Sequence, residues 1–171
     1  MPVSRFEHLL VTANRGVIFV MMAVMAMLVF VNVVCRYIFT FSIIWAEEVS
    51  QYLMIWIAYL GAGLAMREGR HVAIEMLQDR LPTPLGRTLR MVVGGLVLGF
   101  LGLVTVLGFQ FVAFAWQQET PVLNISLGIP YLAVPIGAML FALHLLLTFR
   151  NYVEKQYAPG YILEDLSGEE M

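Results

Sequence analysis

The sequence predicts an all-α integral membrane protein with four transmembrane helices, both termini in the cytoplasm, and a short amphipathic surface helix between the second and third spans. Three observations carry this prediction. The 171 residues are 60% hydrophobic and only 13% charged, whereas soluble domains are about 45–50% apolar and about 25% charged. Four apolar runs are each long enough to cross a hydrocarbon core of about 30 Å as a helix. The basic residues gather on one side of these runs.

The four spans are expected at about residues 16–37, 43–66, 91–115 and 129–149, within one membrane domain that covers residues 1–171. The first run is longer than the core of a signal peptide, which is about 7–15 residues, and no A-x-A-like cleavage site follows it. In the third span, Gly95 and Gly99 have the G-x-x-x-G spacing of a packing helix, with the second span as the candidate neighbour. Pro135 lies inside the fourth span and should kink it.

The basic residues orient the chain. Of ten Lys and Arg residues, nine precede the first span, lie between the second and third, or follow the fourth, and only Arg36 lies at the opposite end. The positive-inside rule therefore places both termini and the middle loop in the cytoplasm. Within that loop, apolar and polar residues separate onto two arcs of a helix over about residues 71–81, which predicts a surface helix. The acidic tail, residues 158–171, is expected to be loosely ordered.

The composition also excludes several classes of function. The net charge of −2 gives no indication of a nucleic-acid partner, and a single cysteine excludes an internal disulfide and a multi-cysteine metal site. The sequence contains no phosphate-binding loop and no nucleophile with a base, so we expect neither an enzyme nor a cofactor. The middle of the membrane holds little besides Thr105 and Pro135, whereas a transporter with its own path needs polar groups there.

Two other interpretations account for part of the sequence. His71 and His144 could ligate a haem near the inner face, as in a haem- or quinone-associated membrane anchor of a redox enzyme. Packing of both histidines without a ligand is the simpler interpretation. A small efflux pump would need a carboxylate inside the first span, and the stretch from Gly16 to Cys35 has none.

The second span has two distinct faces. One carries an aromatic stripe, Tyr52, Trp56 and Tyr59, which could meet either lipid or a partner. The other is the small and polar kind of face that lets membrane helices approach closely. Its residues are Glu47, Ser50, Gln51, Ala58, Gly61, Ala62 and Ala65.

Two adjacent carboxylates open this span, shortly after Ser42, the predicted N-cap. The helix dipole favours negative charge there, and the headgroup region lowers the cost of burial. Because adjacent side chains on a helix point about 100° apart, Glu47 is expected on the small face, partly buried and paired with a basic or donor group on a neighbouring helix. Arg36 is the local candidate, and a basic residue of a partner is the other. Glu48 is expected toward a flank and exposed. A solvated helix start and a binding surface both remain open as interpretations.

Several motifs resemble one family. The stretches "WAEEVSQYL" and "GLAMREGRHVAIEML" resemble the region around helix 2 of the small membrane subunit of tripartite ATP-independent periplasmic (TRAP) transporters, the DctQ-like family. There a W-x-E-E element opens the helix and an R-x-G-x-H turn leads to a surface helix. The stretch "SLGIPYLAVPIGAML" resembles the final helix of the same family. The likeness covers nearly the whole chain, and the sialic-acid branch is one match.

The resemblance implies a role and partners. Such a subunit lies in the bacterial inner membrane and extends the fixed scaffold of a large, DctM-like subunit, which holds the substrate and sodium sites and moves as an elevator. A periplasmic substrate-binding protein delivers an organic acid to the outer face. The candidates for contact with these partners are Arg36, Trp45, Glu47, Glu48, Gln51, Tyr52, Trp56 and Tyr59.

The orientation is testable with reporter fusions. Fusions after Arg80 and after Lys155 should report a cytoplasmic position, and an insertion within "ETPVLNIS" should report a periplasmic one, because nine of ten basic residues lie on the predicted inner side. Paired reporters that are active on opposite sides of the membrane provide the control. An external signal from the Arg80 fusion would contradict the topology.

Overall fold

The computed structural model describes residues 5–67 and 83–154. These residues form helices α1 (Arg5–Ile38), α2 (Ile44–Arg67), α4 (Thr83–Ala115), α5 (Gly128–Tyr131) and α6 (Ala133–Glu154). Four helical segments in this part of the chain are long and apolar enough to cross a membrane. The predicted all-α, four-span fold is therefore confirmed. The predicted surface helix at 71–81, His71 and the acidic tail lie outside the described residues.

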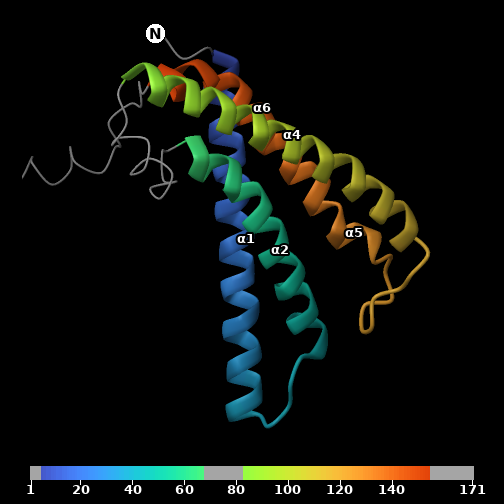
Figure 1. The fold of residues 1–171 in the computed structure, drawn as a ribbon. Helices are drawn as coiled ribbons and strands as arrows, with labels where there is room; N and C mark the ends of the chain where they lie inside the picture. Colours follow the sequence, from blue (N-terminus) through green and yellow to red (C-terminus); the bar gives the residue numbers. More distant parts are fainter. Residues whose placement is uncertain (1–4, 68–82, 155–171) are drawn as a thin grey trace, which may run out of the picture.

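The helices extend beyond the apolar spans predicted for them. Helix α1 begins at Arg5, before the first span predicted from about residue 16, and α4 begins at Thr83, before the third span predicted from about residue 91. A proline in the first helical turn is tolerated because its missing N–H would have no partner within the helix, so Pro84 does not prevent this start. The extra turns lie at the end of the molecule that holds residues 5 and 154, which we call the terminal end (Figure 1).

The fourth span is interrupted, as Pro135 predicted. Helices α5 and α6 are separated at Leu132. Pro135 has no N–H to donate to the carbonyl of Tyr131, so the helical ladder lacks one bond there. The neighbouring bonds continue across the break, from Leu132 N–H to the Gly128 carbonyl (2.9 Å) and from Ile136 N–H to the Leu132 carbonyl (3.1 Å). Leu132 itself keeps right-handed helical backbone angles.

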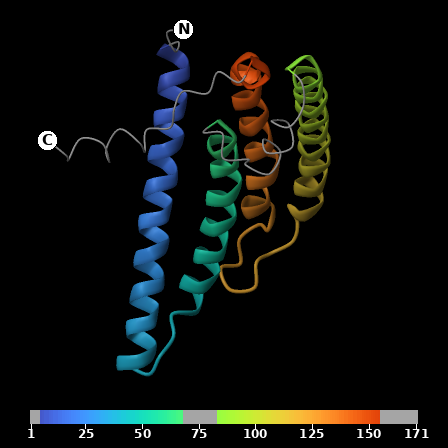
Figure 2. The same ribbon diagram turned by 60° about the vertical axis from the view of Figure 1, so that its left-hand side comes forward.

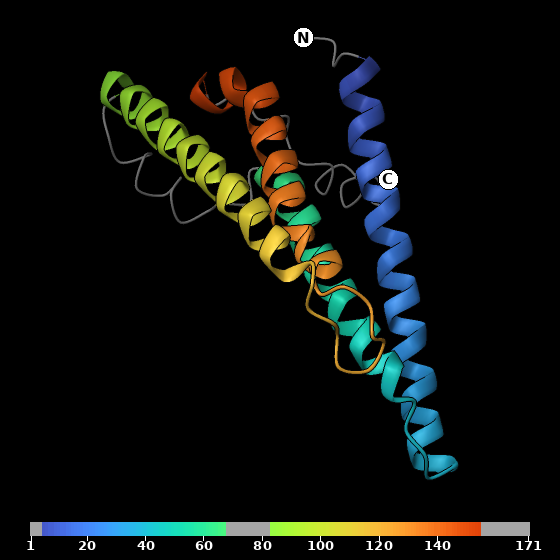
Figure 3. The same ribbon diagram turned by 90° about the vertical axis from the view of Figure 1, so that its right-hand side faces the viewer.

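The four spans form an open row rather than a closed bundle. Helix α2 packs against α1 on one side and α6 on the other, and α6 packs against α4, so the order across the layer is α1, α2, α6, α4 (Figure 2). Seen from the side, α1 and α4 diverge (Figure 3). Only 6% of the most apolar window of α1 is buried, compared with 33% for the fourth span.

Both ends of the described chain lie at the terminal end (Figure 2). The opposite end, which we call the loop end, holds the two described connections, residues 39–43 and residues 116–127. This arrangement agrees with an even number of spans. Which of the two ends faces the cytoplasm stays a prediction from the basic residues.

Close contact between α2 and α6 depends on glycine. A Cβ atom at Gly137 would lie 2.5 Å from Cβ and 3.0 Å from the carbonyl carbon of Tyr59. A Cβ at Gly63 would lie 3.1 Å from Cδ2 of His144, whose side chain is fully buried. Small residues at these crossings let the backbones approach, which is how helices gain packing energy in lipid.

The small and polar face of α2 was expected to be the face that packs against another helix. In the structure, a residue of the aromatic face makes the close contact instead. Tyr59, from the aromatic stripe, lies against α6. Ala58, from the small and polar face, is exposed, and Gly61 has no atom within 4 Å of the position of a Cβ. The other glycine motif behaves in the same way. Gly95 and Gly99 of α4 also have open space around them, and α4 packs on α6 instead of on α2.

Glycine does join α4 to α6, at a different position. A Cβ at Gly108 would lie 3.1 Å from Cδ of Pro135. At the terminal end, buried polar side chains add two ties. Asn14 Nδ2 donates to the Leu60 carbonyl (3.1 Å), and Arg90 Nε donates to the Val153 carbonyl (2.9 Å). Each neighbouring pair in the row therefore has a specific contact besides apolar packing.

The α2–α6 crossing predicts the effect of one added methyl group. Gly137→Ala should lower the free energy of unfolding by about 1–3 kcal/mol, the usual cost of overpacking, because the new Cβ meets backbone atoms of Tyr59 that cannot move aside. Thermal unfolding of the purified subunit in detergent measures this. Gly99→Ala is the matched control, with open space at its Cβ. It should be neutral or stabilising by up to about 1 kcal/mol. Equal melting curves for the two variants would contradict the crossing.

Candidate functional site at the loop end

The carboxylate of Glu48 is buried and holds the long connection at the loop end. Its Oε2 accepts hydrogen bonds from the backbone N–H groups of Val122 (2.9 Å) and Leu123 (3.1 Å). Its Oε1 accepts the hydroxyl proton of Tyr52, one helical turn further along α2. The side chain is only 7% exposed. Glu48 therefore joins α2 to the connection between α4 and α5, 74 and 75 residues away in the sequence.

This connection has a defined shape of its own. Its two arms pair through Thr120 N–H to the Ile125 carbonyl (2.8 Å) and Leu127 N–H to the Gln118 carbonyl (2.8 Å). The hydroxyl of Thr120, a residue only 1% exposed, accepts from Ile125 N–H (3.2 Å). Asn124 closes the turn with φ of 52°, a left-handed conformation that asparagine tolerates better than most residues. We call residues 118–127 the outer hairpin, because the basic residues predict that this end faces the periplasm.

The hairpin also contacts the end of α4. Ser126 donates its hydroxyl proton to the Trp116 carbonyl (2.8 Å) and accepts from Gly128 N–H (3.2 Å). Gly128 is required there, because a Cβ would lie 2.6 Å from Cε3 of the Trp116 ring. The hairpin is thus fixed to α4 by Ser126 and to α2 by Glu48.

Glu47, the other carboxylate, lies on the opposite side of α2 and is exposed. Its Oε1 accepts from Nδ2 of Asn32 on α1 (3.2 Å). The Oδ1 of the same Asn32 accepts from Ile43 N–H (2.7 Å), just before α2 begins at Ile44. The predicted N-cap, Ser42, is exposed outside the helix. A side chain from the neighbouring helix takes over the role of a cap.

The expected burial of the two carboxylates is therefore wrong. Glu47 was expected on a packed face and Glu48 on an exposed flank, and the structure places them the other way round. The reason is the position of α2 in the row. The outer hairpin covers Glu48 and buries its side chain, whereas the groove between α1 and α2 leaves Glu47 exposed. The expected donor for Glu47 on a neighbouring helix is present as Asn32 of α1, although the Glu47 side chain is exposed. The backbone donors of Glu48 in the outer hairpin were not predicted.

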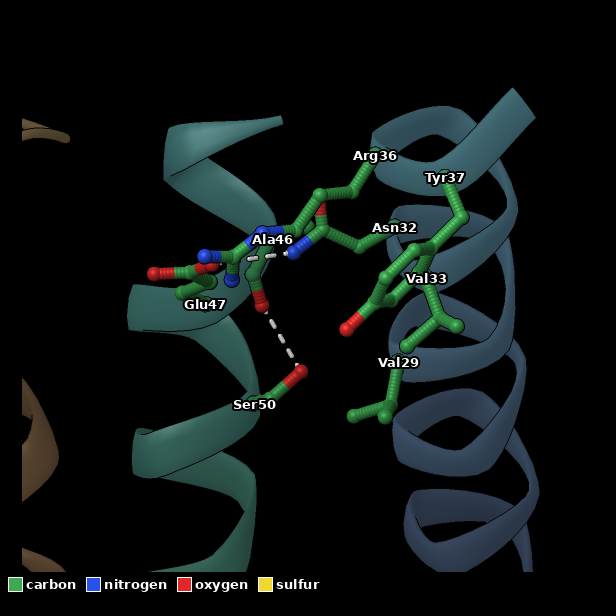
Figure 4. Close-up of a pocket in the computed structure, with 8 residues that line it drawn as sticks. All are labelled: Val29, Asn32, Val33, Arg36, Tyr37, Ala46, Glu47 and Ser50. Atoms are coloured by element: carbon green, nitrogen blue, oxygen red, sulfur yellow. Dashed lines mark hydrogen bonds between the residues drawn. The ribbon is translucent and has the colours of Figure 1, made fainter. Parts of the chain in front are cut away.

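The remaining candidates are spread around the loop end and α2. Arg36, Trp45 and Gln51 are exposed, Tyr59 lies at the α6 crossing, and Trp56 is half-buried. Arg36 and Glu47 lie together at a groove between α1 and α2, where Arg36 extends toward Glu47 (Figure 4). The groove is lined by Val29, Asn32, Val33, Arg36, Tyr37, Ala46, Glu47 and Ser50.

Sequence reasoning missed two residues of this region, Asn32 and Thr120. The signal for Asn32 was present, because an amide inside an apolar run is costly unless it is hydrogen-bonded. Thr120 carried no comparable signal, since threonine is ordinary in a polar connection. Within the described residues, no group of three or more His, Cys, Asp or Glu side chains could hold a metal ion.

Comparison with known proteins places the chain in a wider group. Residues 25–155 match the family model described as "Tripartite ATP-independent periplasmic transporters, DctQ component". A putative TRAP transporter small permease protein of Haemophilus influenzae is 35% identical over 71% of this chain and 70% of its own length. The C4-dicarboxylate TRAP transporter small permease protein DctQ of Rhodobacter capsulatus is 32% identical, over 61% of this chain and 47% of its own.

A third relative has a different length. The isethionate TRAP transporter permease protein DctMQ of Oleidesulfovibrio alaskensis is 27% identical over 60% of this chain. The matched segment makes up only 16% of that protein.

The Glu48 contacts predict how the outer hairpin responds to mutation. In Glu48→Ala, the amides of Val122 and Leu123 lose a charged acceptor, so their hydrogen exchange should accelerate by roughly tenfold or more. The apparent melting temperature should also fall by several degrees. Tyr52→Phe removes one donor and should have a smaller effect. Amide exchange measured by mass spectrometry on peptides that cover residues 118–127 gives the readout.

Glu47→Ala is the matched control for this prediction. Its carboxylate is exposed and bonds to Asn32 of α1, not to the hairpin, so exchange in residues 118–127 should remain at the wild-type rate. Equal exchange in all three variants and the wild type would show that the hairpin does not depend on Glu48.

Proposed function

Because the chain belongs to the DctQ family of TRAP transporter components, we propose that it extends the scaffold of a large, DctM-like elevator subunit. In this proposal the assembled transporter takes up an organic acid, driven by sodium and supplied by a periplasmic binding protein. Family membership and the four apolar helices make the chain a multi-pass subunit of the inner membrane. The coupling ion, the solute class and the scaffolding role are the parts that we propose.

The open row of helices is the observation that carries the scaffolding role. A chain that acted alone in lipid could close its helices into a bundle around a path. Here α1 and α4 form the edges of a layer and have long exposed apolar faces, with Phe19 72% and Phe100 63% exposed. Such a layer has the shape of an element that lies against a larger membrane body, with lipid on its other surfaces.

The matched segment of DctMQ from Oleidesulfovibrio supports a large partner. Most of that permease protein lies outside the matched segment, in the same polypeptide. If the remainder is the large component, as the composite name suggests, the two components function at fixed proximity in that protein. The same proximity between separate chains is what the proposal requires here.

The hydrogen bonds of the polar groups inside the spans favour a translocation path in the partner, not in this chain. The hydroxyls of Ser50, Thr105 and Thr148 each donate to a carbonyl four residues earlier in their own helix, at 2.7–2.8 Å. Their hydrogen-bonding capacity is thus directed at their own backbone and not at a shared site. A translocation path needs polar groups that converge near the midplane.

The outer hairpin is suited to contact with a soluble partner. It is fixed on two sides, and it places Glu119 in an exposed position at the same end of the molecule as the exposed Glu47. A fixed loop loses little conformational freedom on binding. The exposed carboxylates favour a basic patch on the binding protein. This assignment assumes that the loop end faces the periplasm.

The alternative of a haem- or quinone-associated anchor has less support. His144, one of its two ligands, lies in the α2–α6 crossing against Gly63. Membership of a transporter family also favours the permease role.

Reconstitution tests the division of labour. In proteoliposomes with a sodium gradient, the subunit alone should give no uptake of labelled C4-dicarboxylate, isethionate or sialic acid. Uptake of an organic acid should appear only when the large subunit and the binding protein are both present, because the described spans direct their hydroxyls at their own helices. Uptake by the subunit alone would overturn the scaffold role.

The docking surface is tested in the same vesicles at two salt concentrations. Glu119→Gln combined with Glu47→Gln should lower uptake about two- to fivefold at low salt and less at high salt, since exposed charge pairs are weak and screened. Arg87→Gln, an exposed charge in the first turns of α4, is the control. An equal loss in the control would argue against docking at the loop end.

A further inference from the structure

The groove between α1 and α2 at the loop end is separate from the Glu48 contacts. Its volume is about 260 Å³. Three apolar side chains, Val29, Val33 and Ala46, contribute to its lining. Arg36, Asn32 and Glu47 lie toward the loop end, whereas the Tyr37 hydroxyl points away from that end, toward the level of Val33 and Ser50 (Figure 4). The groove therefore combines an apolar part with a polar rim.

The rim offers charges of both signs. Arg36 and Glu47 are both exposed at the groove, together with the exposed phenol of Tyr37. Two other polar groups are already engaged. Asn32 bonds to Glu47 and to Ile43 N–H, and the Ser50 hydroxyl donates to the Ala46 carbonyl. An occupant would thus meet a guanidinium, a carboxylate and a phenol.

The depth of the groove matches a membrane interface. Val29 lies seven residues before Arg36 on α1, which is about 10 Å along the helix axis. With Arg36 near the end of α1, the charged rim falls in a headgroup layer and Val29 in the hydrocarbon region. Exposed Tyr37 and Trp45 at the same end are typical of that layer.

We propose that this groove binds a phospholipid with a phosphoethanolamine headgroup. The phosphate lies on Arg36, the primary ammonium donates to Glu47, and an acyl chain covers Val29 and Val33. One lipid molecule supplies an anion, a hydrogen-bonding cation and a hydrocarbon chain in the order in which the groove presents their counterparts. The proposal goes beyond the transport role, since it does not depend on the solute or on which leaflet the loop end faces.

The chemistry of the headgroup gives a specific test. The transporter, purified with its large subunit, is delipidated and titrated by native mass spectrometry with phosphatidylethanolamine, phosphatidylcholine and phosphatidylglycerol of identical acyl chains. Phosphatidylethanolamine should bind first in the titration, about two- to fivefold more tightly than either of the other two lipids. Choline has no N–H to donate to Glu47, and glycerol has no cation.

Two variants separate the contributions of the rim charges. Glu47→Gln should remove the preference for ethanolamine over choline, while Arg36→Gln should weaken both lipids about two- to fivefold. Glu119→Gln and Arg87→Gln, exposed charges outside the groove, are the controls and should keep the wild-type preference. Equal binding of the three lipids, or the same change in variants and controls, overturns the proposal.

A photo-crosslinker identifies the occupant at the groove itself. Tyr37→p-benzoylphenylalanine in the complete transporter, illuminated in nanodiscs that contain phosphatidylethanolamine, should yield an adduct with the mass of that lipid. A crosslink to the large subunit instead would show a protein segment in the groove and overturn lipid binding. Neither assay measures uptake, so failure here is distinguishable from failure of the transport role.

Discussion

The fold at the loop end depends on one buried carboxylate. A charge that is removed from water must be compensated by hydrogen bonds, and Glu48 receives them from Val122 N–H, Leu123 N–H and the Tyr52 hydroxyl. The need is mutual, because backbone N–H groups near a bilayer also require acceptors. Glu48 and the outer hairpin therefore satisfy each other. This exchange links the α1–α2 half of the row to the α4–α6 half.

Similar polar ties join the other neighbours in the row. Asn32 connects α1 to the start of α2 at the loop end, and Asn14 connects the same two helices at the terminal end. Arg90 connects α4 to the end of α6. In each case a buried side chain bonds to a backbone group of the adjacent element. Lipid supplies no hydrophobic force between apolar helices, so these directional bonds and the glycine crossings fix which helices are neighbours.

The sequence was sufficient to predict the spans but not which spans are neighbours in the layer. Run length and charge bias depend on the bilayer alone, and for that reason the four helices were predicted correctly. Which helix packs against a given helix face depends on the arrangement of all four helices. Gly95 and Gly99 therefore indicated a packing face that has open space in the structure, while Gly137, which has no such motif, lies at the tightest crossing. For the same reason, the expected burial of Glu47 and Glu48 was the reverse of what the structure shows: the neighbours of α2 could not be predicted from its own sequence.

The open row also bears on the scaffold role that we propose. A support for a moving subunit must keep its own helices at constant tilt, and in a single layer each helix has neighbours only along the row. Packing in the middle of the spans would allow adjacent helices to pivot about a crossing such as Gly137 against Tyr59. Ties at opposite ends of the row, from Asn32 and Glu48 at one end to Asn14 and Arg90 at the other, restrict that motion. A layer that is fixed at its two ends can stay rigid without a closed core, and its two broad faces remain available for a partner and for lipid.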